Sequence, residues 1–383
     1  LKLAAHRPTG SAAGAGGCCS LMLQTVNDYR EILLSGAPLM DTRAPIEFSR
    51  GSFPGATNLP LMTDDERAQV GTCYKEKGQE AAIALGHHLV AGEVRSQRID
   101  AWAAFARANP EGYLFCFRGG LRSQIVQRWL AETAGVEYRR IEGGYKAMRQ
   151  FLMATTETAV NERKMWVVGG MTGTGKTELL AKLPHALDLE GCANHRGSGF
   201  GKRVNGQPAQ IDFEHQIAIR FLQLEAAGLP GFVVEDEGHF VGKCALPEHL
   251  YREMNQAPLV WLEDTFENRV ARILRDYVVD QLADHQAFYG ADEGFSQFEA
   301  HLQQSLANIQ KRLGGERYKR ASAMLADALS TQRLSGAVDG HRLWIELLLR
   351  EYYDPMYTHQ KASKAGRIIA AGDADKLHDF LLK

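Results

Sequence analysis

The chain has 383 residues, a formal net charge of −2 and 45% hydrophobic residues, and this length favours two domains, each with its own core. Because there is no overall excess of positive charge, any surface for nucleic acid would have to be local. No segment approaches the roughly 18 apolar residues of a membrane helix and no signal peptide opens the chain, so we expect a cytoplasmic protein with no membrane partner.

Residues 1–21 are rich in Gly, Ala and Ser and precede the first methionine, Met22. We expect them to be an appended or disordered segment outside the fold. They contain Cys18 and Cys19. The other cysteines show no Cys-x-x-Cys spacing, which predicts free thiols rather than disulfides or a zinc site; they are Cys73, Cys116, Cys192 and Cys244.

Residues 22–147 alternate short apolar runs with helical patterns. Such alternation predicts a parallel sheet covered by helices. The expected strands lie within residues 37–43, 56–60, 112–117 and 136–144, and the expected helices within 26–36, 98–110 and 121–135.

Cys116 stands at the C-terminal end of one expected strand, where open α/β sheets hold ligands. A short loop and a helix follow, so loop N–H groups and the positive helix end would favour the thiolate form. Glycines without Cβ atoms let such a loop turn its amides inward around an anion. We predict that Cys116 is a nucleophile over an anion cradle made of Arg118, Gly119, Gly120, Arg122 and Ser123.

The first domain resembles the rhodanese family in its Asp41-x-Arg43 strand end and in its turn from Gly51 to Pro60. The resemblance covers about 130 residues and implies a rhodanese-like fold. The Cys116-x5-Arg122-Ser123 spacing also fits cysteine phosphatases. Phe115 stands where those enzymes commonly carry His, and no acid loop is evident nearby. Sulfur-type transfer and phosphate hydrolysis therefore both remain open at this loop.

A helical linker is expected over residues 148–164, followed by a P-loop α/β domain over 165–265. A strand runs into a glycine-rich loop and then into an apolar-periodic helix, which is the context that a P-loop requires. Its amides, one lysine and one hydroxyl would hold a diphosphate or triphosphate, with Thr177 as a ligand of Mg²⁺. The phosphate-binding residues are Gly170, Thr172, Gly173, Thr174, Gly175, Lys176 and Thr177.

Two further stretches of this domain carry candidate residues. The apolar strand that ends in Glu235 and Asp236 resembles a Walker B segment, whose acids order Mg²⁺ through water. The polar, Gly-rich stretch 191–208 suits a mobile segment over the pocket, with Asn194, His195 and Arg196 as lid residues. No Asn-Lys-x-Asp motif occurs, so guanine selectivity is unsupported.

Residues 266–383 lose the strand signals and are expected to form a helical C-terminal region. Basic and aromatic residues gather here and could contact nucleic acid, although solvated helix faces are the commoner explanation. They are Lys311, Arg312, Arg317, Tyr318, Lys319, Arg320, Arg350, Tyr352, Tyr353 and Tyr357.

The combination of the two domains resembles the tRNA 2-selenouridine synthase family from Met22 to the C-terminus, notably in "FCFRGGLRSQ", "GGMTGTGKTELL", "EGCANHRGSGFG" and "YYDPMY". The resemblance implies a tRNA substrate with 2-thiouridine at the wobble position and selenophosphate as selenium donor. It also implies S-geranylation by geranyl diphosphate before selenium enters. We expect no tightly bound cofactor, with Mg²⁺ as the ion that the P-loop would take.

Two alternatives come from other classes of protein. A rhodanese-fold cysteine phosphatase with a nucleotide-binding regulatory domain would hydrolyse phosphoesters at Cys116. A noncatalytic tRNA-binding protein would tolerate loss of Cys116 and of Lys176. The intact Lys176-Thr177 pair and the reactive loop argue against the second alternative.

Overall fold

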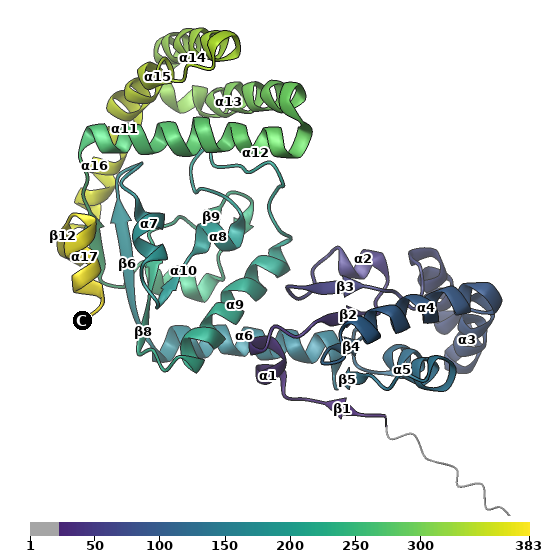
Figure 1. The fold of residues 1–383 in the computed structure, drawn as a ribbon. Coiled ribbons are helices and arrows are strands. Elements are labelled where there is room, and N and C mark those ends of the chain that lie inside the picture. Colours follow the sequence, from purple (N-terminus) through teal and green to yellow (C-terminus); the bar gives the residue numbers. More distant parts are fainter. Residues whose placement is uncertain (1–22) are drawn as a thin grey trace, which may run out of the picture.

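The computed structural model describes residues 23–383, so the segment predicted for 1–21 lies outside the described residues. Two α/β halves follow one another along the chain, and a group of helices stands over the second (Figure 1). The predicted α/β class is confirmed, with two parallel sheets and a largely helical C-terminal region, while the rhodanese-like character of the first domain stays a prediction. Among the helices of residues 23–383, none is both long enough and apolar enough to cross a membrane.

The first half contains a five-stranded parallel sheet in the order β1-β5-β4-β2-β3. The strand that leads into Cys116, β4, is therefore central. The four strands expected from the apolar runs are present, and β1 adds an edge strand that was not expected. The strands are β1 (Thr25–Val26), β2 (Leu39–Asp41), β3 (Ala56–Asn58), β4 (Tyr113–Phe115) and β5 (Arg139–Ile141).

Helices cover both faces of this sheet. Alternate strand residues point to opposite sides, and apolar residues on both sides need a covering layer. Leu114 packs with Trp102 and Val126 on one face, whereas Phe115 packs with Tyr145 on the other. The connecting helices are α1 (Tyr29–Leu34), α2 (Pro45–Phe48), α4 (Gly92–Ala108) and α5 (Leu121–Ala134).

The Asp41-x-Arg43 motif forms a buried ion pair. The Arg43 guanidinium donates to Asp41 (Nη2–Oδ2 2.6 Å) and to the Gly51 carbonyl (2.9 Å), and it lies 3.9 Å from the centre of the Tyr145 ring. Ser52 donates to the same carboxylate at 2.9 Å. The motif therefore fixes the turn after β2 to the sheet, and removing one partner would leave a buried charge.

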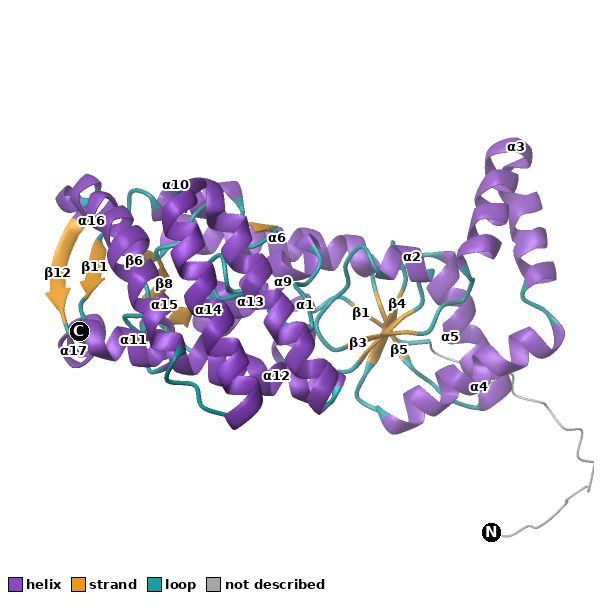
Figure 2. Cartoon of the chain, turned by 90° about the horizontal axis from the view of Figure 1, so that it is seen from above, coloured by secondary structure: helices purple, strands orange, loops and turns teal. Residues whose placement is uncertain are grey.

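Helix α3 (Asp64–Leu89) stands out from the rest of the first half (Figure 2). It starts at a capping box in which Thr63 and Glu66 bond to each other's backbone. Gly78, with φ of 84°, interrupts the helix and divides it into two arms. Gly86 on the second arm faces Val70 on the first.

Helix α6 (Gly144–Glu162) joins the two halves and belongs to both cores (Figure 1). Tyr145 and Leu152 pack in the first half, whereas Ala159 and Val160 pack in the second. The linker predicted for 148–164 thus overlaps a helix that begins four residues earlier, at Gly144, and ends at Glu162.

Helix α9 (Gln210–Ala226) packs against α6 and also contacts the first half of the chain. His215 bonds through Nδ1 to the Ser52 carbonyl at 2.7 Å and stacks on Phe53 at 4.8 Å. Burial lowers the pKa of His215 to about 4, so the imidazole is neutral and donates this bond. Asp212 accepts from the Ser52 amide at 2.7 Å.

The second half contains a five-stranded parallel sheet in the order β12-β11-β6-β8-β7. The sequence pattern did not predict β12, which returns from the C-terminal region to pair with β11. The strands are β6 (Lys164–Gly170), β7 (Ala186–Leu187), β8 (Gly231–Glu235), β11 (Leu259–Leu262) and β12 (Ile368–Gly372). Around them lie α7 (Lys176–Ala181), α8 (Leu189–Ala193), α10 (Glu248–Met254), α17 (Ala374–Leu381) and the hairpin β9 (Phe240–Val241) and β10 (Cys244–Ala245).

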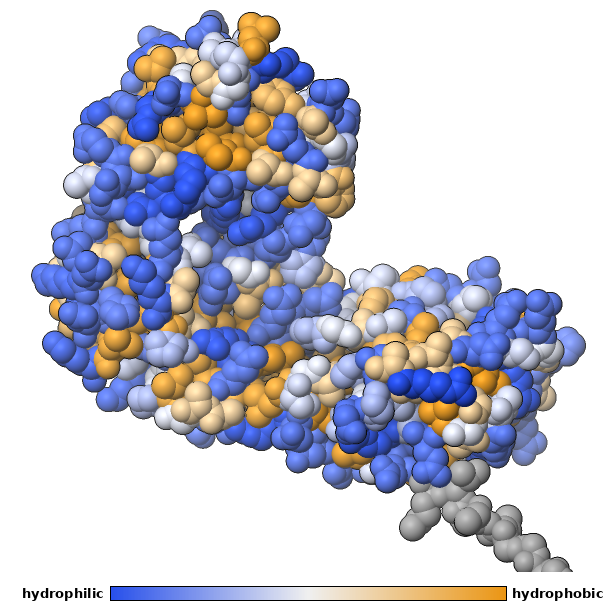
Figure 3. All heavy atoms as spheres, viewed as in Figure 1, coloured by the Kyte–Doolittle hydropathy of each residue, from blue (hydrophilic) through white to orange (hydrophobic). Residues whose placement is uncertain are grey.

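The remaining helices form a cluster with its own apolar core, which includes Phe298, Leu302 and Trp344. On the face shown in Figure 3, hydrophobic side chains gather over these helices at the top of the view. The helices that build this core are α11 (Phe266–Leu274), η1 (Arg275–Val279), α12 (Asp280–Tyr289), α13 (Ala291–Leu313), α14 (Gly315–Ser335), α15 (His341–Leu348) and η2 (Leu349–Tyr353). The short α16 (Asp354–Ser363) and η3 (Ala365–Arg367) add no residue to it and lead on to β12.

Candidate functional site

Cys116 lies directly after the central strand β4 and is only 3% exposed. Its Sγ donates to Ser123 Oγ at 3.2 Å, and that hydroxyl donates to the Gly120 carbonyl at 3.0 Å. The carbonyl of Cys116 accepts from the Tyr145 amide at 2.9 Å. The thiol is therefore held at the base of a loop whose two ends are fixed.

Gly119 is required by the close approach of this loop to the start of α6. Its φ is 62°, and a Cβ atom there would lie 2.7 Å from the Gly143 nitrogen and 2.8 Å from the Ile141 carbonyl oxygen. Arg140 donates to the Gly119 carbonyl from the neighbouring strand. The loop is thus shaped by backbone contacts that a larger residue would disrupt.

The two predicted arginines of the cradle differ in their surroundings. Arg122 makes a two-pronged ion pair with Glu47 (Nη1–Oε2 2.6 Å and Nη2–Oε1 3.2 Å). Burial opposes charge on Arg122, but Glu47, and after it Cys116, raise the pKa of the guanidinium above its ordinary value. Arg118 is exposed, and its guanidinium lies 6.0 Å from the Phe117 ring centre. The structure therefore gathers Cys116, Gly120 and Ser123 closely, with Arg122 fixed beside them.

The predicted P-loop joins β6 to α7 in the second half. Gly173 and Gly175 have φ of 80° and 87°, which favours glycine at both places. The Lys176 ammonium lies 3.5 Å from the Gly170 carbonyl, across the mouth of the loop. Thr174 is buried and donates to the Met171 carbonyl at 2.9 Å. Residues 172–177 line a cavity of about 360 Å³ that can accept a phosphate group.

Carboxylates line the opposite side of this cavity. Thr177 Oγ1 donates to Glu190 at 3.3 Å, and the Glu190 amide donates to Glu235 at 2.8 Å. Burial, followed by the charges of Asp188 and Glu190, raises the pKa of Glu235 well above its ordinary value. Burial and Glu190 raise the pKa of Glu237 to about 8. These acids repel one another, so a cation or a bound proton would stabilise the group.

The two predicted Walker B acids are placed differently from each other. Glu235 is 2% exposed, and its Oε2 has no hydrogen-bond partner within the described chain. Asp236 instead pairs with Lys364 at 2.6 Å. Glu190 and Glu237 line the cavity, and the sequence analysis missed both. Glu190 follows a two-residue strand that is too short to recognise, and Glu237 is the residue directly after Glu235 and Asp236, the two acids that were predicted.

The predicted lid residues form an ordered turn after α8. Asn194, with φ of 48°, donates to Asn205 and to the Gly206 carbonyl, both at 2.6 Å. His195 is 8% exposed, and burial followed by Arg203 lowers its pKa. Arg196 lines the phosphate cavity, and its guanidinium lies 5.7 Å from the Tyr277 ring centre. Of the three, only Arg196 reaches the cavity.

Arginines of α11 and η1 support the P-loop from the helical cluster. Arg272 donates to the Gly173 carbonyl at 2.6 Å and pairs with Asp264 at 2.8 Å. Arg269 donates to the Thr172 carbonyl at 2.8 Å. Arg275 pairs with Glu178 at 2.6 Å. Their spacing of three residues places them on one helix face, a signal that the sequence analysis did not use.

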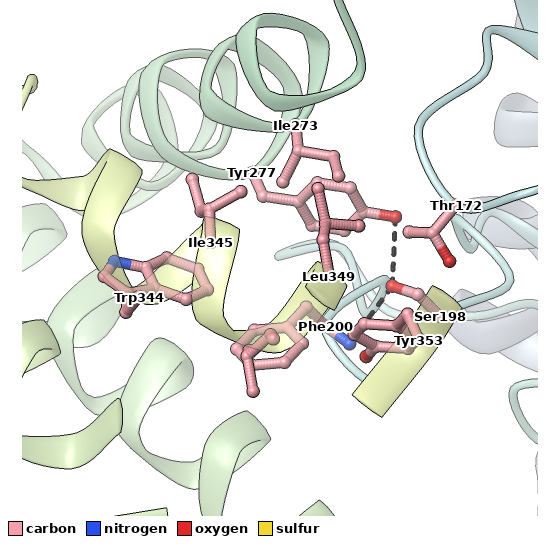
Figure 4. A pocket seen from close by; sticks show the side chains of 10 residues that line it. Thr172, Ser198, Phe200, Ile273, Tyr277, Trp344, Ile345, Leu349 and Tyr353 are labelled. Carbon is pink, nitrogen blue, oxygen red and sulfur yellow. Dashed lines mark hydrogen bonds between the residues drawn. The ribbon is translucent and has the colours of Figure 1, made fainter. Parts of the chain in front are cut away.

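An apolar cavity adjoins the phosphate cavity and is shown in Figure 4. The two cavities share Thr172, Ser198, Ile273 and Tyr277. The Ser198 hydroxyl lies 2.9 Å from the Tyr277 hydroxyl at their boundary. Beyond this pair the wall is formed by apolar and aromatic side chains from several helices: Phe200, Trp344, Ile345, Leu348, Leu349 and Tyr353.

The predicted nucleic-acid residues of the helical cluster are only partly available. Arg317 and Arg320 both pair with Glu351, at 3.2 and 3.0 Å. Tyr353 lines the apolar cavity, and Tyr357 lines the phosphate cavity. These two tyrosines thus contribute to the site.

The residues beside the P-loop fit a magnesium ion. Within residues 23–383, no three His, Cys, Asp or Glu side chains are grouped so that they could hold a metal ion alone. Mg²⁺ usually takes one or two protein oxygens and completes its shell with phosphate oxygens and water. The Thr177 hydroxyl and the Glu190 carboxylate supply such oxygens 3.3 Å apart.

Comparison with known proteins gives a consistent result over the whole described chain. Residues 163–383 match the family model described as "tRNA 2-selenouridine synthase AAA domain". A tRNA 2-selenouridine synthase of Pseudomonas putida F1 is 59% identical over 92% of this chain and 96% of its own length. Relatives with the same name from Pseudomonas fluorescens Pf0-1 and Azotobacter vinelandii are each 60% identical, over 93% and 92% of this chain and 97% and 96% of their own.

Proposed function

Because this chain belongs to the tRNA 2-selenouridine synthase family, and is therefore an enzyme that transfers selenium to tRNA, we propose a reaction in two steps. The substrate is 2-thiouridine at the tRNA wobble position. In the first step geranyl diphosphate alkylates its sulfur at the P-loop site. In the second step selenium from selenophosphate replaces that sulfur at the Cys116 loop.

The observation that carries the first step is the junction of two cavities with opposite character. The P-loop cavity carries the Lys176 ammonium and the loop amides, whereas the adjoining cavity is apolar. The apolar cavity has a volume of about 30 Å³, so a hydrocarbon chain would enter it only when side chains such as Trp344 and Leu349 move apart. A ligand that then fills both cavities has an anionic head and a hydrocarbon tail. Geranyl diphosphate has this structure, whereas a nucleotide would place a polar base and ribose against Trp344 and Leu349.

In the first step the uridine sulfur attacks C1 of the geranyl group and the C–O bond breaks. Diphosphate leaves with the bonding electrons, and N3 of the base loses its proton. Lys176, Arg196 and the P-loop amides stabilise the charge that develops on diphosphate. Mg²⁺ held by Thr177 and Glu190 would further neutralise this leaving group.

The second step requires an anion site beside a group that can handle selenium. The Cys116 loop offers the Arg122 guanidinium and a buried thiol, which suit selenophosphate. Selenium attacks C2 of the base, and the thioether sulfur leaves as geranyl thiolate. Water supplies the oxygen that phosphorus gains as the Se–P bond breaks, and its two protons go to N3 and to the thiolate.

The test is to incubate the protein with 2-thiouridine tRNA and each combination of the two donors, and to analyse the wobble nucleoside by mass spectrometry. We expect S-geranyl-2-thiouridine with geranyl diphosphate alone and 2-selenouridine with both donors. Unchanged 2-thiouridine under every combination would overturn the proposal. Hydrolysis of a generic phosphomonoester that depends on Cys116 would favour the phosphatase alternative instead.

A further inference from the structure

A second apolar cavity lies in the first half, away from the P-loop. It is enclosed by the two arms of α3 and by the start of α5, and its volume is about 280 Å³. Its wall consists almost entirely of hydrocarbon and aromatic side chains, including Met62, Val70, Ile83, Leu121, Ile125 and Trp129.

This cavity reaches the Cys116 loop through two consecutive residues. Leu121 and Arg122 line it, and they are the first residues of α5, directly after Gly120 of the loop. Glu47 holds Arg122 and also binds Arg67 of α3 (Nε–Oε2 3.1 Å). The anion cradle and the wall of the cavity therefore share one ion-paired frame.

The cavity opens to solvent at its rim. Tyr74 on the first arm of α3 is 57% exposed and Leu121 is 46% exposed, although both line the cavity. A volume of about 280 Å³ is close to the lower end of ligand pockets, which is roughly 300 Å³. The space can thus accept a flexible hydrocarbon chain whose other end stays at the loop.

The donor anion alone does not account for such a wall. Selenophosphate is small and fully charged, and it gains nothing from contact with Ile83 or Trp129. A ligand that uses both the cradle and the cavity has a reacting centre next to charge and an apolar group attached to it. In the second step proposed above, the thioether of the tRNA is such a ligand.

We propose that this cavity binds the geranyl chain of S-geranyl-2-thiouridine during selenium transfer and then releases it as geranyl thiol. The inference rests on the proposed S-geranyl intermediate. When selenium forms its bond to C2, the C–S bond breaks and its electron pair goes to sulfur, which takes a proton derived from water. The chain is buried both before and after this event, so the cavity positions the leaving group rather than the nucleophile.

The test uses the full-length protein, selenophosphate and tRNA prepared in advance with S-geranyl- or S-methyl-2-thiouridine. Ile83→Trp fills the cavity, and Tyr74→Arg places a charge at its exposed rim where folding is least disturbed. Ala84→Trp is the matched control, because Ala84 is exposed on the same arm of α3 and does not line the cavity. Selenouridine formation is followed by mass spectrometry.

We expect the unaltered protein to have at least a tenfold higher kcat/KM for the S-geranyl than for the S-methyl substrate. Ile83→Trp and Tyr74→Arg should reduce this preference to less than threefold, while Ala84→Trp retains it. All three should still form S-geranyl-2-thiouridine from geranyl diphosphate at the normal rate. An unchanged preference for the S-geranyl substrate in both cavity variants would overturn the inference. So would a loss of geranylation as large as the loss of selenium transfer.

This design separates the inference from the proposed function. If the unaltered protein made no S-geranyl-2-thiouridine from geranyl diphosphate, the first step of the proposed function would fail. The chain-length preference is measured on thioethers made beforehand, so it is read independently of that step. If thermal melting showed Ile83→Trp to be unfolded, Tyr74→Arg alone would decide the outcome.

Discussion

The two loops predicted to bind anions have similar backbone settings and differ in what surrounds them. Each follows a parallel strand, contains at least one glycine with positive φ and enters a helix. The Cys116 loop adds one buried thiol and one arginine already paired with Glu47. The P-loop adds a lysine, nearby arginines and a group of mutually repelling acids. In the proposed reaction each loop would hold an anion, and the side chains around it would decide whether that anion is selenophosphate or a leaving diphosphate.

The largest expected effect comes from the loop that carries the thiol. Cys116→Ser should lower selenium transfer to S-geranyl-2-thiouridine tRNA on the order of 10³-fold, because a hydroxyl is a far weaker acid than a thiol and passes a proton less readily to the leaving geranyl thiolate. Geranylation of 2-thiouridine tRNA should stay within about twofold, since the P-loop site is separate. Mass spectrometry of the wobble nucleoside measures both half-reactions.

Cys73→Ser is the matched control, because Cys73 is a free thiol of the same half. It lines neither the apolar cavity beside α3 nor the phosphate cavity. It should leave both half-reactions unchanged. Loss of geranylation with selenation spared in Cys116→Ser would reverse the assignment of the two loops.

The next effect is the reciprocal change at the P-loop. Lys176→Ala should lower geranylation on the order of 10²-fold, because the ammonium stabilises charge that develops on diphosphate. Selenation of tRNA that is already geranylated should be unaffected. Single-turnover assays with geranyl diphosphate and with prepared S-geranyl tRNA measure the two rates.

Lys182→Ala provides the comparison for charge alone, since Lys182 is exposed at the end of the same helix. It should change neither rate by more than about twofold. Equal losses in Lys176→Ala and Lys182→Ala would mean that general surface charge, rather than the loop, acts on the reaction.

The strands and the two loops could be predicted from the sequence, but the residues that pair with them across the fold could not. The runs before Cys116 and before the P-loop are strongly apolar and each is followed closely by glycines, so the local pattern was enough to place both loops. Arg122 was predicted as part of the anion cradle, but its ion pair with Glu47, 75 residues away in the sequence, was not predicted. Pairing of this kind depends on tertiary packing, which a local pattern does not contain.

Longer-range features were missed for the same reason. β12 pairs with β11 across about a hundred residues of helical chain, and its five residues, two isoleucines followed by Ala, Ala and Gly, are too short a run to predict a strand. The sequence of helix α3 shows no clear apolar face, because few of its residues are strongly hydrophobic and Gly78 interrupts the helical periodicity. The apolar cavity beside the P-loop is assembled from four separate stretches of the chain, so no single stretch predicts it.

A smaller effect concerns the pH dependence of folding stability, which should have opposite signs for the P-loop acids and for Glu47 of the Cys116 loop. Burial and Glu190 raise the pKa of Glu237 from 4.5 to about 8, so the folded protein keeps a proton that the unfolded chain has lost. Stability should therefore fall as pH rises from 4.5 to about 8. Glu237→Gln should stabilise the protein at pH 8 by about 1 kcal/mol and flatten this dependence. Denaturant unfolding at pH 6 and pH 8 measures the change.

Glu47 of the other loop should respond in the opposite direction. Arg122 and Arg67 outweigh burial and lower the pKa of Glu47 below 4.5, so its stabilising effect is present above that pH and is lost as pH falls. Glu47→Gln should thus weaken stability at neutral pH. Glu248→Gln is the control, because that side chain is 79% exposed. Parallel pH profiles for Glu237→Gln and the unaltered protein would refute the account of the P-loop acids.

The smallest expected effect concerns Arg118, the exposed arginine of the Cys116 loop. Arg118 is exposed, so its charge is screened by water and acts on arriving anions rather than on the bound one. Arg118→Ala should raise the KM for selenophosphate about two- to fivefold, leave kcat unchanged, and lose this effect at high salt. Arg128→Ala on the exposed face of α5 is the control and should change neither constant. A fall in kcat with an unchanged KM would instead place Arg118 on the reacting selenium, and the Cys116 loop would then resemble the P-loop in using several cations at once.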